Sequence, residues 1–386
     1  MQLLNLNIEG YRSLKNITWH PGKLNVLIGP NGSGKSNLIK ALSLMVEACK
    51  GKLYETLVNT GGVYPLLWDG QVDTIKWNLE LVSDDKSLEY GFSLKYRLKS
   101  GTYFIQKETL KNKSDKKELL PSELLELNKK VPVDLSSPLY SGEYSEGKYS
   151  FTETIYSQMS PVEDQVYRAF RRWINEITLY HDMPVGENAP IRRSSLLRVE
   201  KKVSSDGQNL IPVLHTLYSS NRDFKSDIDM AMNAAFDSEF VELVFPPAED
   251  QRIQLKIIWK SMKRPQGMAD LSDGTIKYLL LLAILANPEP PAMIIIDEPE
   301  NGLHPAMLPV IAEYAYAASE RTQIVLSTHS AELLNCIGEF NPTVTVFKNE
   351  SGETNLKNCD GAELERWLQK YTLGKLFLSG NLEELL

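Results

Sequence analysis

The sequence predicts an α/β fold: a mixed sheet with an antiparallel β meander and an inserted, mainly helical lobe. The apolar run KLNVLIG (23–29) leads through a glycine-rich turn into residues 36–49, whose apolar positions recur on one helical face. The runs AMIIID (292–297) and TQIVLS (322–327) are short, apolar and end in polar residues, as buried parallel strands do. Between 74 and 106 apolar and polar residues alternate, which indicates half-buried antiparallel strands.

Length suggests one domain that carries a large insertion. The 386 residues exceed the usual domain size of roughly 100–200 residues. We expect a head built from residues 1–106 and 236–386, the second part ending in helices, with an inserted lobe over residues 107–235. The pattern loosens in that middle segment, which holds a charged run, a Ser/Gly/Tyr-rich stretch and helix-like pieces.

Charge, cysteine usage and hydropathy exclude several classes of protein. The net charge of −8 gives no long-range attraction for nucleic acid, so any DNA contact requires a local basic patch. Cys49, Cys336 and Cys359 lack the spacing of a metal site or a redox pair and indicate reduced thiols. The first residues lack the pattern of a secretory leader, and no apolar run approaches the roughly 20 residues of a membrane span. We therefore expect a cytoplasmic protein without a membrane partner.

The stretch GPNGSGKSN (29–37) predicts a phosphate-binding loop. It fits G-x-x-x-x-G-K-[ST] in full, with a strand before it and a helix after it. Its glycines let backbone N–H groups turn inward around a phosphate, and the helix N-terminus adds partial positive charge. Lys35 can reach the β- and γ-phosphate oxygens, and the Ser36 hydroxyl is placed for Mg²⁺. The predicted nucleotide-binding residues are Gly29, Asn31, Gly32, Ser33, Gly34, Lys35, Ser36 and Asn37.

Polar residues at the ends of two later strands could supply a Mg²⁺ ligand, a general base and a further phosphate contact. Asp297 can hold Mg²⁺ through water, and Glu298 can orient or deprotonate an attacking water molecule. His329 follows the next apolar strand, where an imidazole could hydrogen-bond a γ-phosphate. Taken alone, the Asp-Glu pair could instead cap the following helix, and the histidine could be structural.

A second anion-binding position is predicted at LSDGT (271–275). It puts Ser272 and Gly274 at the start of an apolar helix, where the N-terminal N–H groups favour an anion. The alternative is that Ser272 or Asp273 caps that helix.

The order of these motifs resembles one family of ATPases. EGYRSLKN, GPNGSGKSN, LSDGT, IIIDEPENGLHP and LSTHS follow one another as in the ABC-type ATPase heads of the soluble branch that includes RecF, the SMC proteins and the OLD-family ATPases. The resemblance covers the first hundred residues and roughly 250–345. It implies a P-loop NTPase fold of ABC-ATPase head type that binds ATP with Mg²⁺. It also implies that Glu298 is the catalytic base, residues 301–304 the D-loop, His329 the switch histidine and LSDG the signature motif.

The sequence also departs from the family pattern. LSDGT replaces the transporter-type LSGGQ, and His304 stands where many D-loops have Asp. For the glutamine loop we find only Gln71 as a candidate. Arg12 resembles the arginine that follows the first strand in this branch, although a surface arginine is an equal reading.

With one phosphate loop and one signature motif in the chain, the resemblance implies a homodimer that encloses two ATP molecules. The first functional hypothesis is a DNA-associated ATPase in DNA maintenance or anti-phage defence, supported by a basic cluster that a solvated surface would also explain. The cluster consists of Arg192, Arg193, Arg198, Lys201 and Lys202, with Arg168, Arg171 and Arg172 upstream.

Two other functions stay open at this point. An ATP-gated scaffold could control a separately encoded effector such as a nuclease, because the residues after His329 are too few for the nuclease domain of OLD-type relatives. A transporter ATPase is a remote alternative, since the inserted lobe is larger than a usual helical subdomain and the signature lacks its glutamine.

Overall fold

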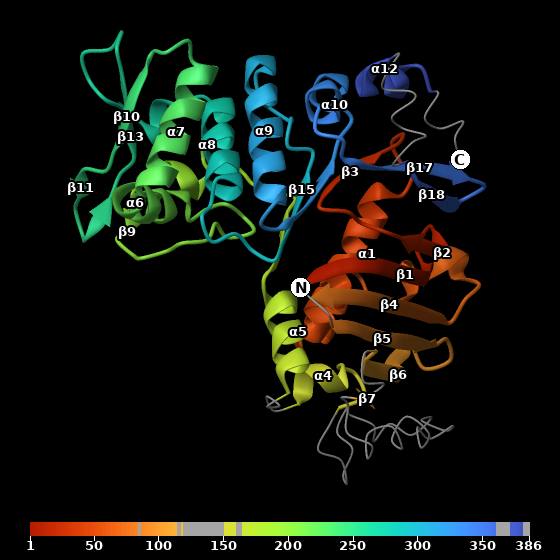
Figure 1. Ribbon diagram of the computed structural model, residues 1–386. Coiled ribbons are helices and arrows are strands. Elements are labelled where there is room, and N and C mark those ends of the chain that lie inside the picture. The colour runs from red at the N-terminus through yellow and green to blue at the C-terminus, as the bar shows by residue number, and fades with distance from the viewer. Residues whose placement is uncertain (84–85, 114–116, 119–149, 160–163, 360–370, 381–386) are drawn as a thin grey trace.

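The computed structural model describes residues 1–83, 86–113, 117–118, 150–159, 164–359 and 371–380. Two six-stranded sheets dominate them, and the helix α1 (Lys35–Cys49) lies between the sheets (Figure 1). Most of the charged run noted in the sequence lies within the described residues, whereas the Ser/Gly/Tyr-rich stretch falls almost entirely outside them.

The central sheet has the strand order β18-β17-β3-β16-β15-β8. The five strands from β17 to β8 run parallel, and β18 is an antiparallel edge strand. The bounds are β3 Leu24–Ile28, β8 Ile177–Tyr180, β15 Met293–Asp297, β16 Gln323–Ser327, β17 Thr343–Glu350 and β18 Glu353–Cys359. Because parallel strands share a direction, the residues that follow β3, β8, β15 and β16 meet at one edge of the sheet.

The second sheet is an antiparallel meander in the order β2-β1-β4-β5-β6-β7. The predicted alternating segments form β4 and β5 and the start of β6. The bounds are β1 Gln2–Tyr11, β2 Leu14–Trp19, β4 Thr74–Ser83, β5 Lys86–Arg97, β6 Thr102–Asn112 and β7 Lys117–Glu118. Trp77 of β4 donates its indole N–H to the carbonyl oxygen of Ala41 at 3.0 Å, so α1 is fixed to this sheet as well as to the central one.

Helices cover the other face of the central sheet, and a smaller β structure packs beside them (Figure 1). The helices are α6 Leu210–Ser220, α7 Arg222–Ala235, α8 Asp273–Leu285, α9 Leu308–Ser319, α10 Ala331–Gly338 and α12 Leu373–Leu378. The short strands are β9 Ser195–Leu196, β10 Phe240–Val244, β11 Pro247–Ala248, β12 Arg252–Ile253, β13 Lys256–Trp259 and β14 Gln266–Gly267.

The segment 107–235, predicted above as an inserted lobe, is divided between the two cores. The helices α4 (Ile155–Gln158) and α5 (Gln165–Asn175) pack with α1 and the meander. The strand β8 joins the central sheet beside β15, whereas α6 and α7 pack with α8 and α9. The four residues of β8 are too few to show a period, which is why the sequence alone did not reveal this edge strand of the central sheet.

Candidate functional site

The phosphate loop, residues 29–37, connects β3 to α1 as predicted. Gly34 precedes α1 with a φ of 111°, a left-handed conformation that favours glycine. A Cβ on Gly34 would lie 2.1 Å from the Thr354 hydroxyl oxygen, and one on Gly29 would lie 2.3 Å from the Phe347 carbonyl oxygen. The hairpin β17–β18 therefore packs directly on the loop, and side chains at these two positions would displace it.

The interior of the phosphate loop holds polar groups suited to a phosphate. The buried Lys35 ammonium donates to the carbonyl oxygens of Gly29 at 2.7 Å and Pro30 at 3.1 Å. The Ser33 hydroxyl is buried and has no hydrogen-bond partner within the described residues. An orphaned hydroxyl costs free energy unless a ligand or water satisfies it, and an ammonium beside two carbonyls can turn toward an anion. These residues fit a nucleotide phosphate group.

Contacts from distant segments hold the loop in place. Thr354 of β18 donates its hydroxyl to the Ser33 carbonyl oxygen at 2.9 Å and lies 2.7 Å from the Ser13 hydroxyl. Asn37, predicted as a nucleotide-binding residue, donates its side-chain amide to Ser13 at 2.8 Å. Ser13 and Thr354 are separated by 341 positions, so no local pattern predicts this network.

Asp297 ends β15 and is held from both sides by neighbouring strands. Ser327 of β16 donates its hydroxyl to one carboxylate oxygen, and Nδ1 of His181 lies 2.6 Å from the other. A carboxylate only accepts hydrogen bonds, so Nδ1 carries the proton in this contact. The Asp297 side chain is 13% exposed. Sequence reasoning missed His181, although a histidine directly after a short apolar run was a usable signal.

The structure also shows where the glutamine-loop candidate lies. The side-chain amide of Gln71 donates to Asp69 at 2.8 Å in an exposed turn that follows η2 (Trp68–Gly70). The position beside Asp297 at the end of the adjacent strand is taken by His181 instead.

Glu298 lies next to Asp297 in a left-handed conformation, with φ 48°. That conformation costs a non-glycine residue about 1 kcal/mol or more, and such strain clusters at functional sites. One carboxylate oxygen is 3.6 Å from Nε2 of His329, and the other accepts from the side-chain amide of Asn301. Burial and the positive charge of Lys35 lower the pKa of His329. Lys35, Glu298 and His329 are thus close enough to influence one another.

Glu300, the last acid of DEPE, joins the two strand-end loops. One of its oxygens accepts from the Thr328 hydroxyl and from the backbone N–H groups of His329 at 3.0 Å and Ser330 at 3.1 Å. Its other oxygen is buried without a partner among the described residues. Glu300 therefore fixes the turn that presents His329, a role that sequence reasoning did not assign.

The signature loop, residues 271–275, lies at the start of α8, which packs with α6 and α7 on a different part of the molecule from α1 (Figure 1). Ser272 caps α8, because its hydroxyl accepts from the Thr275 backbone N–H at 3.1 Å. A Cβ on Gly274 would lie 2.6 Å from the Gly302 carbonyl oxygen, so the signature loop packs closely on the loop that follows Glu298. The capping alternative therefore holds for Ser272, and it leaves the N–H groups of the first two helical residues without intrahelical partners.

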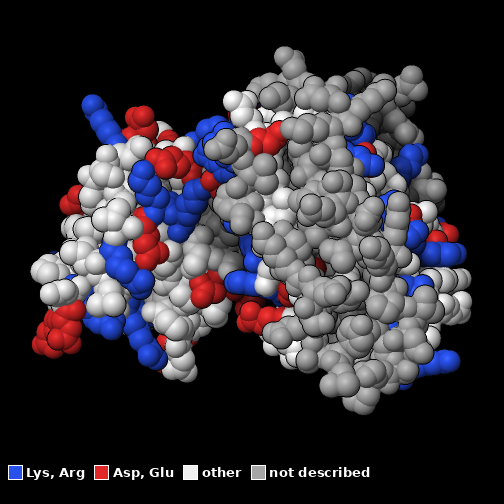
Figure 2. Space-filling model, turned by 90° about the horizontal axis from the view of Figure 1, so that it is seen from below, with Lys and Arg blue, Asp and Glu red and all other residues white. Residues whose placement is uncertain are grey.

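The basic cluster proposed from the sequence is largely paired with acidic groups. Arg192 is 7% exposed and contacts Asp273, which corrects its assignment as a surface residue. Lys201 pairs with Glu289 at 2.8 Å. Arg198 and Lys202 lie 3.6 and 3.7 Å from the carboxylates of Glu200 and Glu176. On the face seen in Figure 2, the described basic and acidic side chains are interspersed.

Arg12 and His304, the two remaining motif residues, have local contacts. Arg12 adopts φ 48° and donates its backbone N–H to the Leu66 carbonyl oxygen at 2.7 Å. Its guanidinium lies 5.7 Å from the ring centre of Tyr11, and its Nε is buried without a partner within the described chain. Nδ1 of His304 accepts from the Ala306 backbone N–H at 3.2 Å, so this histidine caps η5 (Pro305–Met307).

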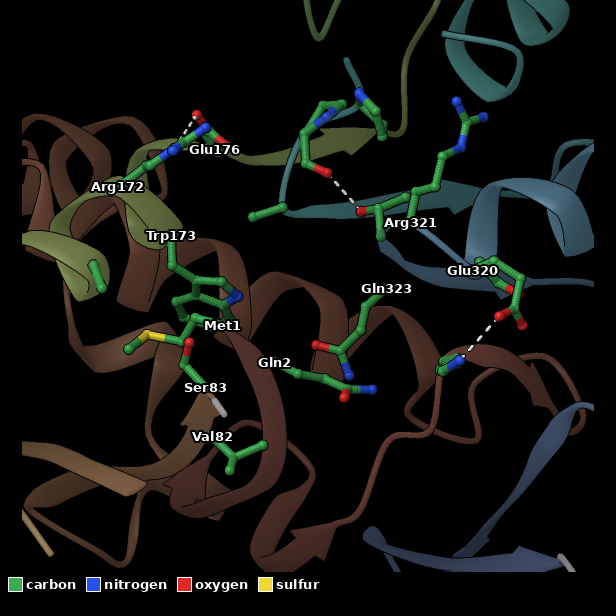
Figure 3. Close-up of a pocket in the computed structure, with 17 residues that line it drawn as sticks. Met1, Gln2, Val82, Ser83, Arg172, Trp173, Glu176, Glu320, Arg321 and Gln323 are labelled. Carbon is green, nitrogen blue, oxygen red and sulfur yellow. Dashed lines mark hydrogen bonds and ion pairs between the residues drawn. The ribbon is translucent and has the colours of Figure 1, made fainter. Parts of the chain in front are cut away.

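A cavity of about 580 Å³ lies at the opposite edge of the central sheet (Figure 3). Residues that precede or begin its strands line it, among them Lys23 and Gln323. Its charged groups largely pair with one another: Arg172 with Glu176 at 3.2 Å and Lys23 with Glu320 at 3.0 Å. The groups suited to phosphate chemistry therefore gather at the other edge, where ligands of open α/β sheets bind.

The described residues hold neither a metal-binding cluster nor a membrane-spanning helix. They contain no group of three His, Cys, Asp or Glu that could hold a metal ion by itself. No helix among the described residues has the length and apolar character needed to cross a membrane.

A strand–loop–helix unit of this kind, with carboxylates at the end of another parallel strand of the same sheet, defines a P-loop nucleotide-binding head. The chain belongs to the family described as "AAA domain, putative AbiEii toxin, Type IV TA system", which matches residues 24–335. A comparison with curated proteins gives no significant match.

Solved SMC heads share the fold. An Smc head bound to the C-terminal winged-helix domain of ScpA is 11% identical, with a TM-score of 0.54, over 95% of this chain and all of that one. An Smc head with an extended coiled coil, from a complex with the C-terminal domain of ScpA derived from Pyrococcus furiosus, is 12% identical, with a TM-score of 0.53, over 95% and 98%. The predicted fold class is confirmed, and family and fold together identify an ATPase-type domain.

Proposed function

We propose that this protein binds ATP with Mg²⁺ in the phosphate loop and hydrolyses it slowly. The observation that carries the proposal is the convergence of Lys35, Asp297, Glu298 and His329 at one edge of the central sheet. The buried Ser33 hydroxyl, which has no partner in the described part of the chain, adds support, because a phosphate oxygen would satisfy it. Membership of an AAA family agrees with this chemistry.

Each side chain has a role that its contacts suit. Ser36 and Asp297 would hold Mg²⁺, which neutralises phosphate charge when it is bound. Glu298 acts as the general base, since its carboxylate is 39% exposed and oriented by Asn301. His329 contacts the γ-phosphate and lies near enough to Glu298 to report on it. Lys35 exchanges its two carbonyl partners for phosphate oxygens.

We further propose that two copies close over two ATP molecules. The signature loop and the phosphate loop lie on different parts of one molecule, so a nucleotide in one phosphate loop would meet the signature loop of another copy (Figure 1). Ser272 and Gly274 would then contact its phosphates through the start of α8. Several charge-assisted contacts can supply the roughly 5.5 kcal/mol needed to shift a dimer from 1:99 to 99:1.

The output of this cycle is proposed to be control of a partner. The paired state of Arg192, Lys201 and Lys202 removes support for the basic cluster as a DNA surface and favours an ATP-gated scaffold that acts on a separate effector protein. The Smc head structure bound to a domain of ScpA is an example of this fold with a protein partner. Direct action on DNA stays the competing proposal.

The mass of Glu298→Gln in solution tests the proposal. This variant keeps the shape of the side chain but cannot act as a base, so it should retain ATP and accumulate as a dimer with Mg-ATP while the ADP form is monomeric. Its hydrolysis rate should fall about 10²–10⁴-fold. Unchanged hydrolysis would contradict the assignment of the base, and a mass independent of nucleotide would contradict the dimer.

Adding a short DNA duplex to the same measurement distinguishes direct action on DNA from control of a separate effector protein. Co-migration of DNA with the ATP-bound dimer at fixed salt would favour direct action on DNA. A dimer that ignores DNA would favour the scaffold.

A further inference from the structure

The signature loop carries an acidic residue where, under the proposed function, a phosphate approaches. Asp273 is the first residue of α8, and its side chain is 62% exposed. The free N–H groups at a helix start attract anions, but a carboxylate at the same position repels them. Without compensation, Asp273 would weaken the contact on which closure of the dimer depends.

The compensating charge is a buried arginine that comes from 81 positions earlier in the chain. Arg192 donates through Nη2 to the Asp273 carboxylate, and its own side chain is only 7% exposed. It ends the short helix η3 (Pro190–Arg192), which packs beside η4 (Met268–Asp270) immediately before the signature loop.

The other donors of Arg192 bind backbone carbonyl oxygens of the signature loop and of two segments beside it. Nη1 donates to the carbonyl oxygens of Leu271 at 2.7 Å and Met268 at 3.1 Å, and Nε donates to Val185 at 2.8 Å. A guanidinium is a rigid fork with five donors, so one side chain can fix a loop and a carboxylate together. Burial and these bonds tie the positive charge to the signature loop rather than to a surface ligand.

We propose that Arg192 is a positioning residue that neutralises Asp273 and thereby lets the start of α8 accept the phosphates of a nucleotide held by a second copy. The inference rests on the proposed function, because it concerns the closed dimer. It predicts that the charge of the pair, not the length of either side chain, decides how readily ATP closes the dimer.

Removing the charge of Arg192, of Asp273 or of both tests the role of the pair, in a parent protein that carries Glu298→Gln. Arg192→Gln keeps amide donors for the loop carbonyls but leaves Asp273 unneutralised, and we expect it to need about tenfold more ATP for half-maximal dimer formation. Asp273→Asn alone should change this concentration less than about threefold. The double variant, Arg192→Gln with Asp273→Asn, should return close to the parent. Each variant is also measured for thermal unfolding and for ATP binding as a monomer, which the phosphate loop alone should support.

The outcomes separate this inference from the proposed function. A parent that forms no dimer with ATP would contradict the proposed function itself. If the parent forms a dimer with ATP and the Arg192→Gln variant forms one equally well, the proposed role of Arg192 is overturned. A defect that the double variant does not relieve would also overturn it, because the loss would then come from loop structure rather than charge. A defect that shrinks as salt is raised and disappears in the double variant is the predicted result.

Discussion

The phosphate loop and the signature loop both begin a helix, yet they satisfy their polar groups in opposite ways. In the phosphate loop, Lys35 is bonded to backbone carbonyls and the Ser33 hydroxyl has no partner within the described chain. In the signature loop, Ser272 caps its own helix and Asp273 is bonded to Arg192. Under the proposed function, a phosphate would complete the polar contacts of the first loop, whereas the second loop has its polar side chains already paired and would be approached by a phosphate from outside.

The largest expected effect comes from Lys35→Ala in the incomplete loop. Loss of a charge-assisted hydrogen bond of about 1.5–3 kcal/mol should weaken ATP binding roughly ten- to a hundredfold. Folding stability should change little, since alanine is a good helix former. Titration of a fluorescent ATP analogue measures the affinity. Lys40→Ala, at an exposed position on the same helix, is the matched control; equal affinity of both variants would contradict a phosphate contact by Lys35.

A smaller effect is expected at His181, which completes the phosphate site from β8. His181→Ala removes the donor from one Asp297 oxygen and should raise the Mg²⁺ concentration needed for tight ATP binding about tenfold. His181→Asn keeps a donor near the position of Nδ1 and should restore most of this loss. The measurement is ATP affinity at a series of Mg²⁺ concentrations. Equal defects in the two variants would show that His181 does not act through that hydrogen bond.

The smallest effect on either loop is expected from Glu108, a buried acid outside both. Its carboxylate accepts from the backbone N–H groups of Ile155 and Tyr156 and from the Tyr90 hydroxyl. Burial nevertheless raises the pKa of Glu108 from its ordinary 4.5 to about 7. The folded state thus keeps a proton that the unfolded chain releases, so stability falls as pH rises from 4.5 to 7, by about 3 kcal/mol over these 2.5 units.

Glu108→Gln should remove this pH dependence while ATP binding stays unchanged. The amide keeps an acceptor oxygen for one backbone N–H, and it cannot ionise. Thermal unfolding between pH 5 and 8 should show a shallower decline than in the parent, whereas the exposed Glu55→Gln should follow the parent. If the stability of Glu108→Gln declines with pH as steeply as that of the parent, a group other than Glu108 causes the pH dependence.

Sequence patterns predicted the local parts of the site and missed the parts that depend on strand order. The strand, glycine-rich turn and helix around the phosphate loop lie within about twenty residues, so their local pattern predicts the loop. Asp297, Glu298 and His329 stand at the ends of two apolar strands that the sequence also predicts. His181 contacts Asp297 only because β8 pairs with β15, and Arg192 reaches Asp273 only once α8 is packed. Thr354 supports the loop from β18, far away in the chain. These contacts join segments far apart in the chain, and of the three residues only His181, which directly follows a short apolar run, had a local signal.

The claim that each ATP site combines two copies can be tested by mixing two inactive variants. Lys35→Ala disables the phosphate loop, and Gly274→Val disables the signature loop through its clash with the Gly302 carbonyl oxygen. Each variant alone should hydrolyse little ATP, although Gly274→Val should still bind it. In a mixed dimer, one site would combine the intact phosphate loop of one copy with the intact signature loop of the other. We predict that mixing folded samples restores a substantial fraction of parental hydrolysis, and a mixture no more active than its components would contradict the composite site.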